Sequence, residues 1–265
     1  MAATNEAPRT ALVTGAARRI GRAIAYDLAA QGWQIAVHYH TSEDEALEVV
    51  AEIRDRGGAA VALCADLADE TEAATLLPRA ADAFGPVTLL VNNASIFEHD
   101  RPESADRDSW QRHMAINLRA PLVLTQGLLA QLPEEANAPN APGIHANVVN
   151  LIDARVFRLT PNYTSYSVSK VGLWGLTQHL ALALAPRIRV NGIAPGPALP
   201  SAEAPDEAFA RLCRTMPLQH GTSPDELCRA LRFILEAPGM TGQVITLDGG
   251  QHLGWLLPGQ LQPSS

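Results

Sequence analysis

Cysteine and basic residues are both scarce in this sequence. Its three cysteines, Cys64, Cys213 and Cys228, lie far apart along 265 residues. An odd number without close spacing predicts neither a disulfide framework nor a zinc site, and it fits the reducing cytoplasm. The 20 basic residues are outnumbered by 28 acidic ones, for a net charge of -8. This balance argues against nucleic acid or an anionic membrane as the main partner, although a small anion can still bind locally.

Long apolar runs are absent as well. No run reaches the roughly 18 residues that a membrane-spanning helix needs, and the first nine residues lack the apolar core of a signal peptide. We therefore expect no membrane partner. No break in composition divides the chain, so we predict one domain over residues 10–255, with flexible ends at residues 1–9 and 256–265.

Short apolar stretches alternate with helical patterns along the chain. The predicted strands are residues 10–13, 34–39, 60–64, 87–91, 148–152, 188–193 and 244–247. Helices are predicted over residues 43–56, 71–84, 106–132 and 223–236, and around Tyr166 and Lys170. Apolar strands that alternate with helices indicate an α/β fold: a single-domain Rossmann fold with a doubly wound parallel sheet of about seven strands. Ligands of such sheets bind at the carboxyl ends of the strands.

Three segments depart from this alternation. Pro121 predicts a local irregularity in the helix over residues 106–132. Residues 133–142 are rich in proline and asparagine and are predicted to form an exposed loop. Residues 198–220 mix proline, serine and acids with a short helical pattern, which is typical of a mobile lid over a substrate.

A glycine turn follows the first predicted strand and opens a helix. Gly15 permits a tight turn, and Gly21 lets the helix and the strand approach closely. The free N–H groups at the start of the helix, beside Arg18, Arg19 and Ile20, favour a bound phosphate. Arg19 stands where many dinucleotide-binding folds have glycine, so a plain turn between strand and helix remains an alternative.

The second predicted strand ends in polar residues rather than in an acid. NAD-binding folds usually carry an acid there, which accepts hydrogen bonds from the adenosine ribose and repels a 2′-phosphate. The run before the first acid, Glu43, is Tyr39, His40, Thr41 and Ser42. Together with Arg18 it offers donors without negative charge, which favours NADP(H) over NAD(H); a merely polar strand end is the alternative.

Polar or turn-forming residues follow the other predicted strands too. Asp66 and Leu67 follow the third strand, where they could edge an adenine ring. Asn93, Ala94 and Ser95 follow the fourth strand, and Pro195 and Gly196 follow the sixth. The carboxyl ends of parallel strands meet at one edge, so these residues are expected to converge.

Tyr166 and Lys170 are four residues apart and so share one face of their helix. A free phenol, with a pKa near ~10, holds its proton too tightly to shuttle it well at neutral pH. A neighbouring cation lowers that pKa, so we expect Tyr166 to act as the acid and Lys170 to lower its pKa. Taken alone, the pair could equally be an ordinary surface pair. Asp153, at the end of the strand before this helix, would join the site or simply cap the following loop.

In this order and spacing, several motifs together resemble the short-chain dehydrogenase/reductase family over residues 11–252. The motifs are Thr14-Gly15 with Gly21, Asn92-Asn93-Ala94, Asn117, Tyr166 with Lys170, and Pro195-Gly196. Within the family, the sequence is most similar to pteridine reductases and to the folate-linked reductases of bacteria. The features behind this likeness are Arg19, His38-Tyr39-His40, Ser95 with Phe97, and Asp153 where most members carry a serine.

The resemblance implies roles for individual residues. It implies NADPH as cofactor, a pterin or folate-like small molecule as substrate, and a homotetramer. No cluster of residues has the spacing of metal ligands, so we expect no metal. The implied catalytic residues are Asp153, Tyr166, Lys170 and Asn117. The implied cofactor contacts are Gly15, Arg18, Arg19, Ile20, Gly21, Tyr39, His40, Thr41, Ser42, Asp66, Leu67, Asn93, Ala94, Ser95, Tyr166, Lys170, Pro195 and Gly196. The implied substrate contacts are Arg19, Ser95, Phe97, Asp153 and Tyr166, with the flat pterin between Phe97 and the nicotinamide.

Other functions stay open at this point. A carbonyl reductase for a ketone or a 3-oxoacyl thioester needs the same Tyr166 and Lys170, but a carboxylate at position 153 donates poorly to a carbonyl oxygen unless it is protonated. A non-catalytic NADP(H)-binding regulator would not need Tyr166, Lys170 and Asn117 together. The relatives usually carry arginine where this chain has Thr41, so one phosphate contact is missing.

Overall fold

A computed structural model describes residues 9–132, 146–200 and 206–254. Most of the predicted N-terminal segment (1–9), the predicted loop (133–142), part of the predicted lid (201–205) and the predicted tail (256–265) lie outside the described residues. Among the helices that the structure describes, none combines the length and the apolar character needed to cross a membrane.

The centre of the molecule is one seven-stranded sheet in the order β3-β2-β1-β4-β5-β6-β7. Its strands are β1 (Thr10–Val13), β2 (Gln34–Tyr39), β3 (Ala60–Cys64), β4 (Val87–Asn92), β5 (Ala146–Leu151), β6 (Ile188–Pro195) and β7 (Val244–Leu247). All neighbouring strands pair in parallel. The predicted fold class, a single-domain doubly wound parallel sheet, is confirmed.

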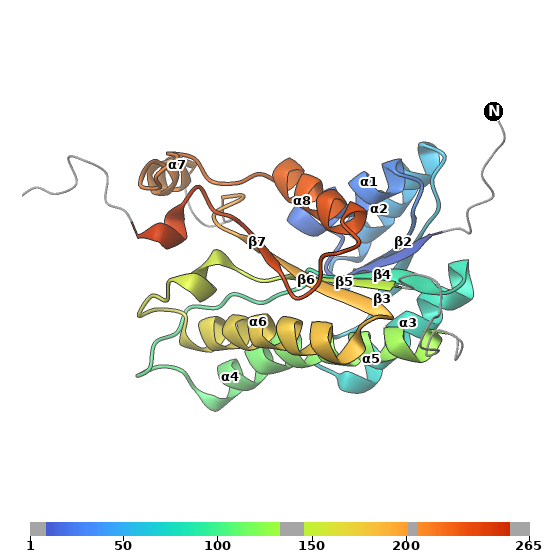
Figure 1. The fold of residues 1–265 in the computed structure, drawn as a ribbon, viewed down its shortest axis with the longest axis horizontal. Helices are drawn as coiled ribbons and strands as arrows, with labels where there is room; N and C mark the ends of the chain where they lie inside the picture. The colour runs from blue at the N-terminus through green and yellow to red at the C-terminus, as the bar shows by residue number, and fades with distance from the viewer. Residues whose placement is uncertain (1–8, 133–145, 201–205, 255–265) are drawn as a thin grey trace, which may run out of the picture.

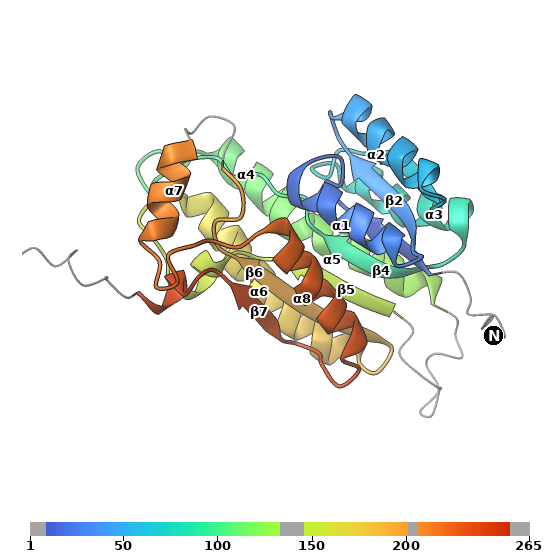
Figure 2. The same ribbon diagram turned by 90° about the horizontal axis from the view of Figure 1, so that it is seen from above.

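Helices cover both faces of the sheet (Figures 1 and 2). On one face lie α1 (Arg19–Ala30), α2 (Glu43–Asp55) and α8 (Pro224–Glu236). On the other lie α3 (Glu70–Phe84), α4 (Arg107–Met114), α5 (Ala120–Gln131) and α6 (Thr164–Leu184). Short helical turns η3 (Ala154–Phe157) and η4 (Gln251–Leu253) and the helix α7 (Asp206–Arg214) lie together at one end of the sheet.

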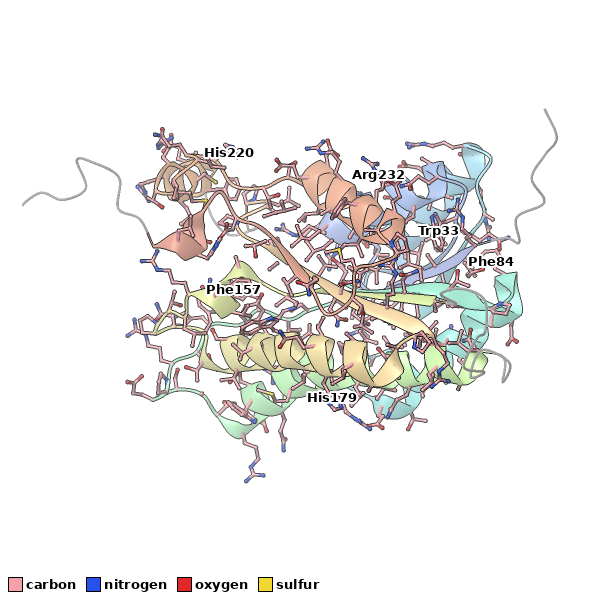
Figure 3. All side chains as sticks on the ribbon, viewed as in Figure 1. Trp33, Phe84, Phe157, His179, His220 and Arg232 are labelled. Carbon is pink, nitrogen blue, oxygen red and sulfur yellow. The ribbon has the colours of Figure 1, made fainter. Side chains whose placement is uncertain are left out.

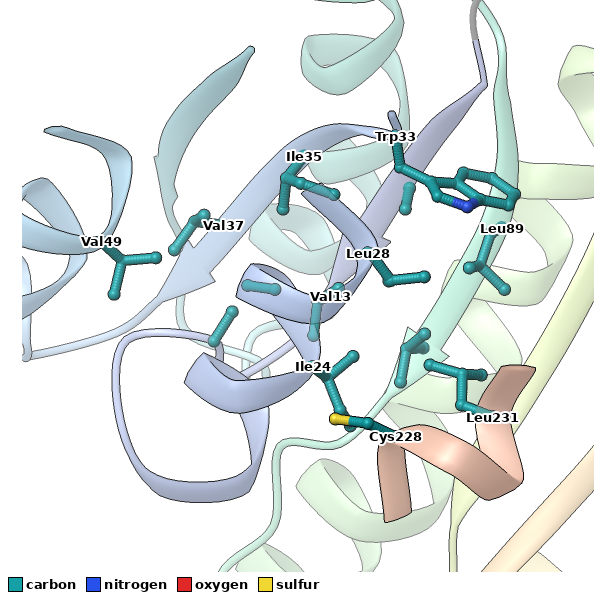
Figure 4. Packing of buried hydrophobic residues seen from close by; sticks show 14 of the residues in the cluster. Val13, Ile24, Leu28, Trp33, Ile35, Val37, Val49, Leu89, Cys228 and Leu231 are labelled. Atoms are coloured by element: carbon teal, nitrogen blue, oxygen red, sulfur yellow. The ribbon is translucent and has the colours of Figure 1, made fainter. Parts of the chain in front are cut away.

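Strands that are apolar throughout account for this layering. β1 is buried along its whole length, so it needs cover on both faces. On the α1 side, Val13 and Leu89 pack against Ile24 and Leu28 of α1 and Leu231 of α8 (Figure 4). A second cluster of buried side chains fills the opposite face. These two clusters cover both faces of the sheet, and the strand ends meet at one edge between the layers.

Side-chain caps begin several of the helices, among them α8 and α3. The Ser223 hydroxyl accepts from the Glu226 N–H at 3.3 Å, and the Glu226 carboxylate accepts from the Ser223 N–H at 3.0 Å. This reciprocal pair satisfies N–H groups that no helical carbonyl can reach. The Asp69 carboxylate also caps α3, where it accepts from the Thr71 N–H at 2.8 Å.

The helix predicted over residues 106–132 is not one regular helix. A π-helical turn, η1 (Ala115–Arg119), separates α4 from α5. The irregularity that Pro121 predicts thus lies just before the proline, which occupies the first turn of α5, where its missing N–H is tolerated. Pi-helical turns are frequent at functional sites, and this one carries Asn117.

The carboxyl ends of all seven strands point to one edge of the sheet, as parallel pairing requires. Trp33 and Phe84, which precede β2 and β4, lie at one end of the molecule, and Phe157, which follows β5, lies at the other (Figure 3). Residues far apart in sequence are thereby gathered at the end that carries Phe157.

Candidate active site

Two adjoining cavities open at the carboxyl edge of the sheet. The first has a volume of about 450 Å³. It contains every residue predicted on the glycine turn and behind the second, third and fourth strands. Its lining is Gly15, Ala17, Arg18, Arg19, Ile20, Gly21, His38, Tyr39, His40, Thr41, Ser42, Asp66, Leu67, Asn93, Ala94, Ser95, Ile96 and Ile116.

The glycine turn forms the floor of this first cavity. Gly15 has φ +61°, which glycine adopts without strain. A Cβ on Gly21 would lie only 2.2 Å from the Gly15 carbonyl oxygen, so no larger residue fits there. Arg19 has φ +54°, in the left-handed region. This backbone conformation explains why related turns place glycine at that position.

Asn93 ties the glycine turn to the end of β4. Its side-chain amide donates to the carbonyl oxygens of Thr14 at 2.8 Å and Gly15 at 3.2 Å. In return, the Thr14 hydroxyl oxygen accepts from the N–H groups of Asn93 and Ala94, both at 2.9 Å. These bonds fix the shape of the turn, so Asn93 shapes the cavity as well as lining it.

His38 holds the same turn from the other side, a role that the sequence does not predict. Its Nδ1 accepts from the Gly15 N–H at 3.0 Å, so its Nε2 carries the proton and donates to the Ala65 carbonyl oxygen at 3.1 Å. Burial lowers the pKa of His38 to about 4. The ring is therefore neutral at neutral pH and links the ends of β1 and β3.

The end of β2 is polar, but acids lie nearby. The Arg18 guanidinium lies 3.6 Å from the Glu45 carboxylate, and the Tyr39 hydroxyl donates to the Glu43 carboxylate at 3.2 Å. His40 lies 4.0 Å from the Asp66 carboxylate. Arg18 thus already has an anionic partner, an exposed one that a phosphate could displace.

The second cavity is larger, at about 770 Å³, and shares Arg19, Ile20, Asn93 and Ser95 with the first. It contains all the remaining predicted residues except Asn117. Its other lining residues are Phe97, Leu151, Ile152, Asp153, Ala154, Arg155, Arg158, Thr160, Tyr166, Lys170, Pro195, Gly196, Pro197, Ala198, Leu199, Ala208, Phe209, Leu212, Gln251 and His252. The helix α7 lies within the predicted lid and contributes Ala208, Phe209 and Leu212 to the lining of this cavity. Movement of the lid stays a prediction.

Asp153 and Tyr166 form the polar centre of the second cavity. The Tyr166 hydroxyl donates to Oδ2 of Asp153 at 2.7 Å. Oδ1 of the same carboxylate accepts from the Arg155 N–H at 2.7 Å and caps η3. The two predicted alternatives for Asp153 are therefore both present, because each oxygen serves one of them.

The expected effect of Lys170 on Tyr166 is wrong for this structure. Burial, followed by the charge of Asp153 and the hydrogen bond to it, raises the pKa of Tyr166 well above its ordinary value. The Lys170 ammonium donates instead to the Leu151 carbonyl oxygen at 2.8 Å. Burial lowers the pKa of Lys170 to about 8. The phenol is thus a neutral hydrogen-bond donor, and the pKa of the buried amine lies closer to neutrality than that of an ordinary lysine.

Phe97 forms an aromatic wall beside this pair. Its ring stacks on Tyr163 with centroids 4.2 Å apart, and it meets the Tyr166 ring edge-on at 4.6 Å. The Phe97 side chain remains 51% exposed and lines the cavity, so part of its surface is open to a ligand. The Arg155 guanidinium lies 5.4 Å from its centroid.

Asn117, a predicted catalytic residue, lines neither cavity. Its amide oxygen accepts from the Ser95 hydroxyl at 3.1 Å and from the Ile96 N–H at 2.9 Å. Its amide nitrogen donates to the Ile96 carbonyl oxygen and to the Ser169 hydroxyl, both at 3.0 Å. In this arrangement Asn117 positions the segment that leads to Phe97.

Two histidines lie within helices, His113 in α4 and His179 in α6. His113 is fully buried, with Nδ1 at 2.8 Å from the Ser109 carbonyl oxygen and Nε2 accepting from the Glu98 N–H. His179 is exposed on α6, outside both cavities. Within the described parts of the chain, no three His, Cys, Asp or Glu side chains gather as a metal site would require.

Comparison with known proteins shows the family of the chain. A family profile described as "Enoyl-(Acyl carrier protein) reductase" matches residues 15–252. The chain belongs to the short-chain dehydrogenase/reductase family. This family assignment confirms the resemblance on which the predicted residue roles rest.

Individual members of the family are similar over almost the whole chain. A FolM alternative dihydrofolate reductase 1 from Brucella suis, crystallised with NADP, is 45% identical, with a TM-score of 0.88 over 96% of this chain and 98% of that one. A short-chain dehydrogenase from Burkholderia cenocepacia in complex with NADP is 33% identical, with a TM-score of 0.83 over 93% and 99%. A 3-oxoacyl-[acyl-carrier-protein] reductase from Synechocystis is 31% identical over 91% of this chain and 96% of its own.

Proposed function

We propose that this protein is an NADPH-dependent reductase of a dihydropterin or dihydrofolate. The observation that carries the proposal is the 2.7 Å hydrogen bond between Tyr166 and Asp153, beside the half-exposed ring of Phe97 in one cavity. A pterin is flat and rich in donors and acceptors along its edge. A carboxylate, a phenol and an aromatic face match it better than they match a simple ketone.

The first cavity fits the cofactor. Gly15 and Gly21 leave no side chain over the floor, and the backbone N–H groups that open α1 favour a phosphate. Arg18, His40, Thr41 and Ser42 line the end where a 2′-phosphate would lie. Bound NADPH would supply a hydride to the ring in the second cavity. Pro195 and Gly196, with Lys170, would hold its nicotinamide end. The NADP bound in the Brucella suis and Burkholderia cenocepacia structures supports NADP(H) as the cofactor.

Tyr166 and Asp153 would handle the proton. Because the pKa of Tyr166 is raised, the phenol keeps its proton at neutral pH, and it would give the proton up only to a ring nitrogen that hydride addition to the neighbouring carbon makes strongly basic. Asp153 accepts from Tyr166 now and would accept from the amino group of a pterin in the same position. Ser95 and Arg19 would meet other polar atoms of the ring, since both line the two cavities.

A carbonyl reductase that acts on a 3-oxoacyl thioester is the second candidate. The 3-oxoacyl-[acyl-carrier-protein] reductase from Synechocystis supports it. Position 153 disfavours it, because a carboxylate that already accepts from Tyr166 leaves a carbonyl oxygen fewer donors than a serine would. The similarity to the Brucella suis dihydrofolate reductase, at 45% identity, favours the first candidate.

The deciding experiment is NADPH oxidation with 7,8-dihydrobiopterin, dihydrofolate and a panel of ketones and 3-oxoacyl thioesters. Tyr166→Phe is the blank, because it keeps the ring but lacks the transferable proton. Its turnover should fall by about 10²- to 10⁴-fold. Turnover of ketones alone would move the carbonyl reductase to first place. Cofactor binding without any turnover would favour the non-catalytic regulator.

Two substitutions at position 153 separate proton chemistry from loop capping. Asp153→Asn keeps an oxygen for the Arg155 N–H, whereas Asp153→Ser also restores the hydroxyl common in the family. Both should reduce dihydropterin turnover, and Asp153→Ser should spare or improve ketone turnover. A serine variant that reduces dihydropterins as well as the wild type would overturn the assignment.

We also propose that the protein is a cytoplasmic homotetramer packed on the helices α4, α5 and α6 and on the strand β7. The family resemblance supports the assembly, and three free cysteines suit a reducing compartment. Sedimentation of a monomer at micromolar concentration would remove this proposal.

A further inference from the structure

The second cavity carries positive charge in an acidic protein. The whole chain has a net charge of -8. Yet the cavity is lined by four basic side chains (Arg19, Arg155, Arg158 and Lys170) and a single acid, Asp153. A cavity lined by one sign of charge attracts ligands of the other sign. Lys170 and Asp153 have roles in the proposed hydride and proton transfer, but Arg155 and Arg158 have none.

Arg155 and Arg158 both belong to the turn that begins with Asp153. Arg155 lies in η3, where its guanidinium donates to the Thr160 hydroxyl at 2.9 Å. Arg158 ends η3, and its guanidinium donates to the Gln251 carbonyl oxygen at 3.2 Å. The capping bond from Asp153 sets the direction of this turn. The polar centre and the two arginines are thus parts of one short segment.

These two guanidinium groups are held by neutral partners. In the described portion of the chain, neither lies within 4.0 Å of a carboxylate oxygen, whereas Arg112, Arg119 and Arg232 elsewhere pair with acids. A guanidinium has five donors in a planar fork that suits a carboxylate or a phosphate. Both arginines therefore keep donors for an anion that enters the cavity.

We propose that Arg155 and Arg158 form an anion subsite that recognises a carboxylate-bearing substituent of the substrate. The inference rests on the proposed function and narrows it: the cavity prefers a dihydropterin with a glutamyl group, as in dihydrofolate, to one with an uncharged side chain. Arg155 lies 5.4 Å from the centroid of Phe97, so the subsite begins beside the proposed ring position. The cavity, with about 770 Å³, has room for more than a bicyclic ring.

The test compares two dihydropterins in the full-length protein. KM is measured for dihydrofolate and for 7,8-dihydrobiopterin, which lacks a carboxylate, with Arg155→Gln, Arg158→Gln and the double variant. Arg229→Gln, an exposed arginine on α8 outside both cavities, is the matched control. Circular dichroism and thermal unfolding verify that each variant folds. The Arg158 variant is the cleaner probe, because Arg155 also touches the aromatic wall.

Each arginine should contribute about 3- to 5-fold to the KM for dihydrofolate, as expected for a partly exposed ion pair. The ratio of the two KM values should therefore rise about 10-fold in the double variant and stay constant in the control. Added salt should raise the KM for dihydrofolate in the wild type and have less effect in the double variant. Arg158→Lys should recover part of the loss.

Three results would overturn the inference, and they distinguish a failure of the subsite from a failure of the proposed function. If both dihydropterins are reduced but their KM ratio is unchanged in the double variant, the function stands and the subsite does not. If the wild type reduces neither dihydropterin, the function itself fails and the subsite fails with it. If the double variant raises the KM for acetoacetyl-CoA more than the KM for dihydrofolate, the arginines bind a phosphate of a thioester carrier instead.

Discussion

The Lys170 ammonium lies 5.8 Å from the centroid of the Tyr166 ring and donates its 2.8 Å hydrogen bond to the Leu151 carbonyl oxygen rather than to the phenol. Lys170 and Tyr166 share a helix face, as their spacing predicts, but they are bonded to different partners. Tyr166 stays protonated over the physiological range, while burial lowers the pKa of Lys170 to about 8. The two groups should therefore titrate in different pH windows.

Turnover should depend on pH through Lys170. The amine is charged below its pKa of about 8 and neutral above it, so kcat/KM should fall as the pH rises through about 8. An ordinary lysine would remain charged to about pH 10. The measurement is kcat/KM for dihydrobiopterin between pH 6 and 10.

Lys170→Arg is the informative control for this profile. A guanidinium remains protonated across the whole range, so whatever activity the variant keeps should not fall near pH 8. A fall at the same pH in Lys170→Arg would assign the titration to another group.

The sequence predicts most of the fold because the signals are local. Each apolar run sets a strand, and parallel pairing then gathers the strand ends without further information. Pro121 predicts that the helix over residues 106–132 is irregular, but no local pattern predicts that the irregularity is a π-helical turn at Asn117. Asn117 accepts a hydrogen bond from the Ile96 N–H and donates one to the Ser169 hydroxyl, and both partners lie far away in the sequence. Periodicity alone therefore predicts one continuous helix.

The same distinction between local signals and long-range contacts applies to the candidate site. Residues at strand ends could be predicted because the topology fixes where they meet. The pKa of Tyr166 could not, since its direction depends on burial and on whether Lys170 is bonded to the phenol or to Leu151. His38 was predicted only as part of a family motif. Its two hydrogen bonds connect the end of β2 to Gly15 after β1 and to Ala65 after β3, and only the folded sheet brings these segments together.

Stability should fall in mild acid because of His38. Burial lowers its folded-state pKa from 6.5 to about 4. As the pH falls below 6.5 the unfolded chain takes up a proton that the folded protein cannot, so the free energy of unfolding decreases until about pH 4. The shift corresponds to a loss of about 3 kcal/mol. Urea unfolding at pH 7.5, 6, 5 and 4.5 measures it.

Two variants isolate the contribution of His38. His38→Leu should be less stable at pH 7, because it leaves the Gly15 N–H without an acceptor, at a cost of about 1–3 kcal/mol. Its stability should also change less with pH than that of the wild type. His179→Gln, which alters an exposed histidine, should retain the wild-type slope. Equal slopes in His38→Leu and the wild type would refute the role of His38.

Cofactor preference should respond in opposite directions to the two partners of one ion pair. Arg18 lies 3.6 Å from Glu45 at the end of the cavity proposed for the 2′-phosphate. Arg18→Gln removes a cation and should raise the KM for NADPH about 2- to 5-fold, with little effect on NADH, which lacks that phosphate. Glu45→Gln removes the carboxylate that competes for Arg18 and should lower the KM for NADPH.

Glu48→Gln, which alters an exposed acid on the same helix as Glu45, controls for the change in net charge. A higher KM for NADPH in Glu45→Gln would mean that Arg18 needs Glu45 to be positioned, and that the phosphate is bound by His40, Thr41 and Ser42 instead.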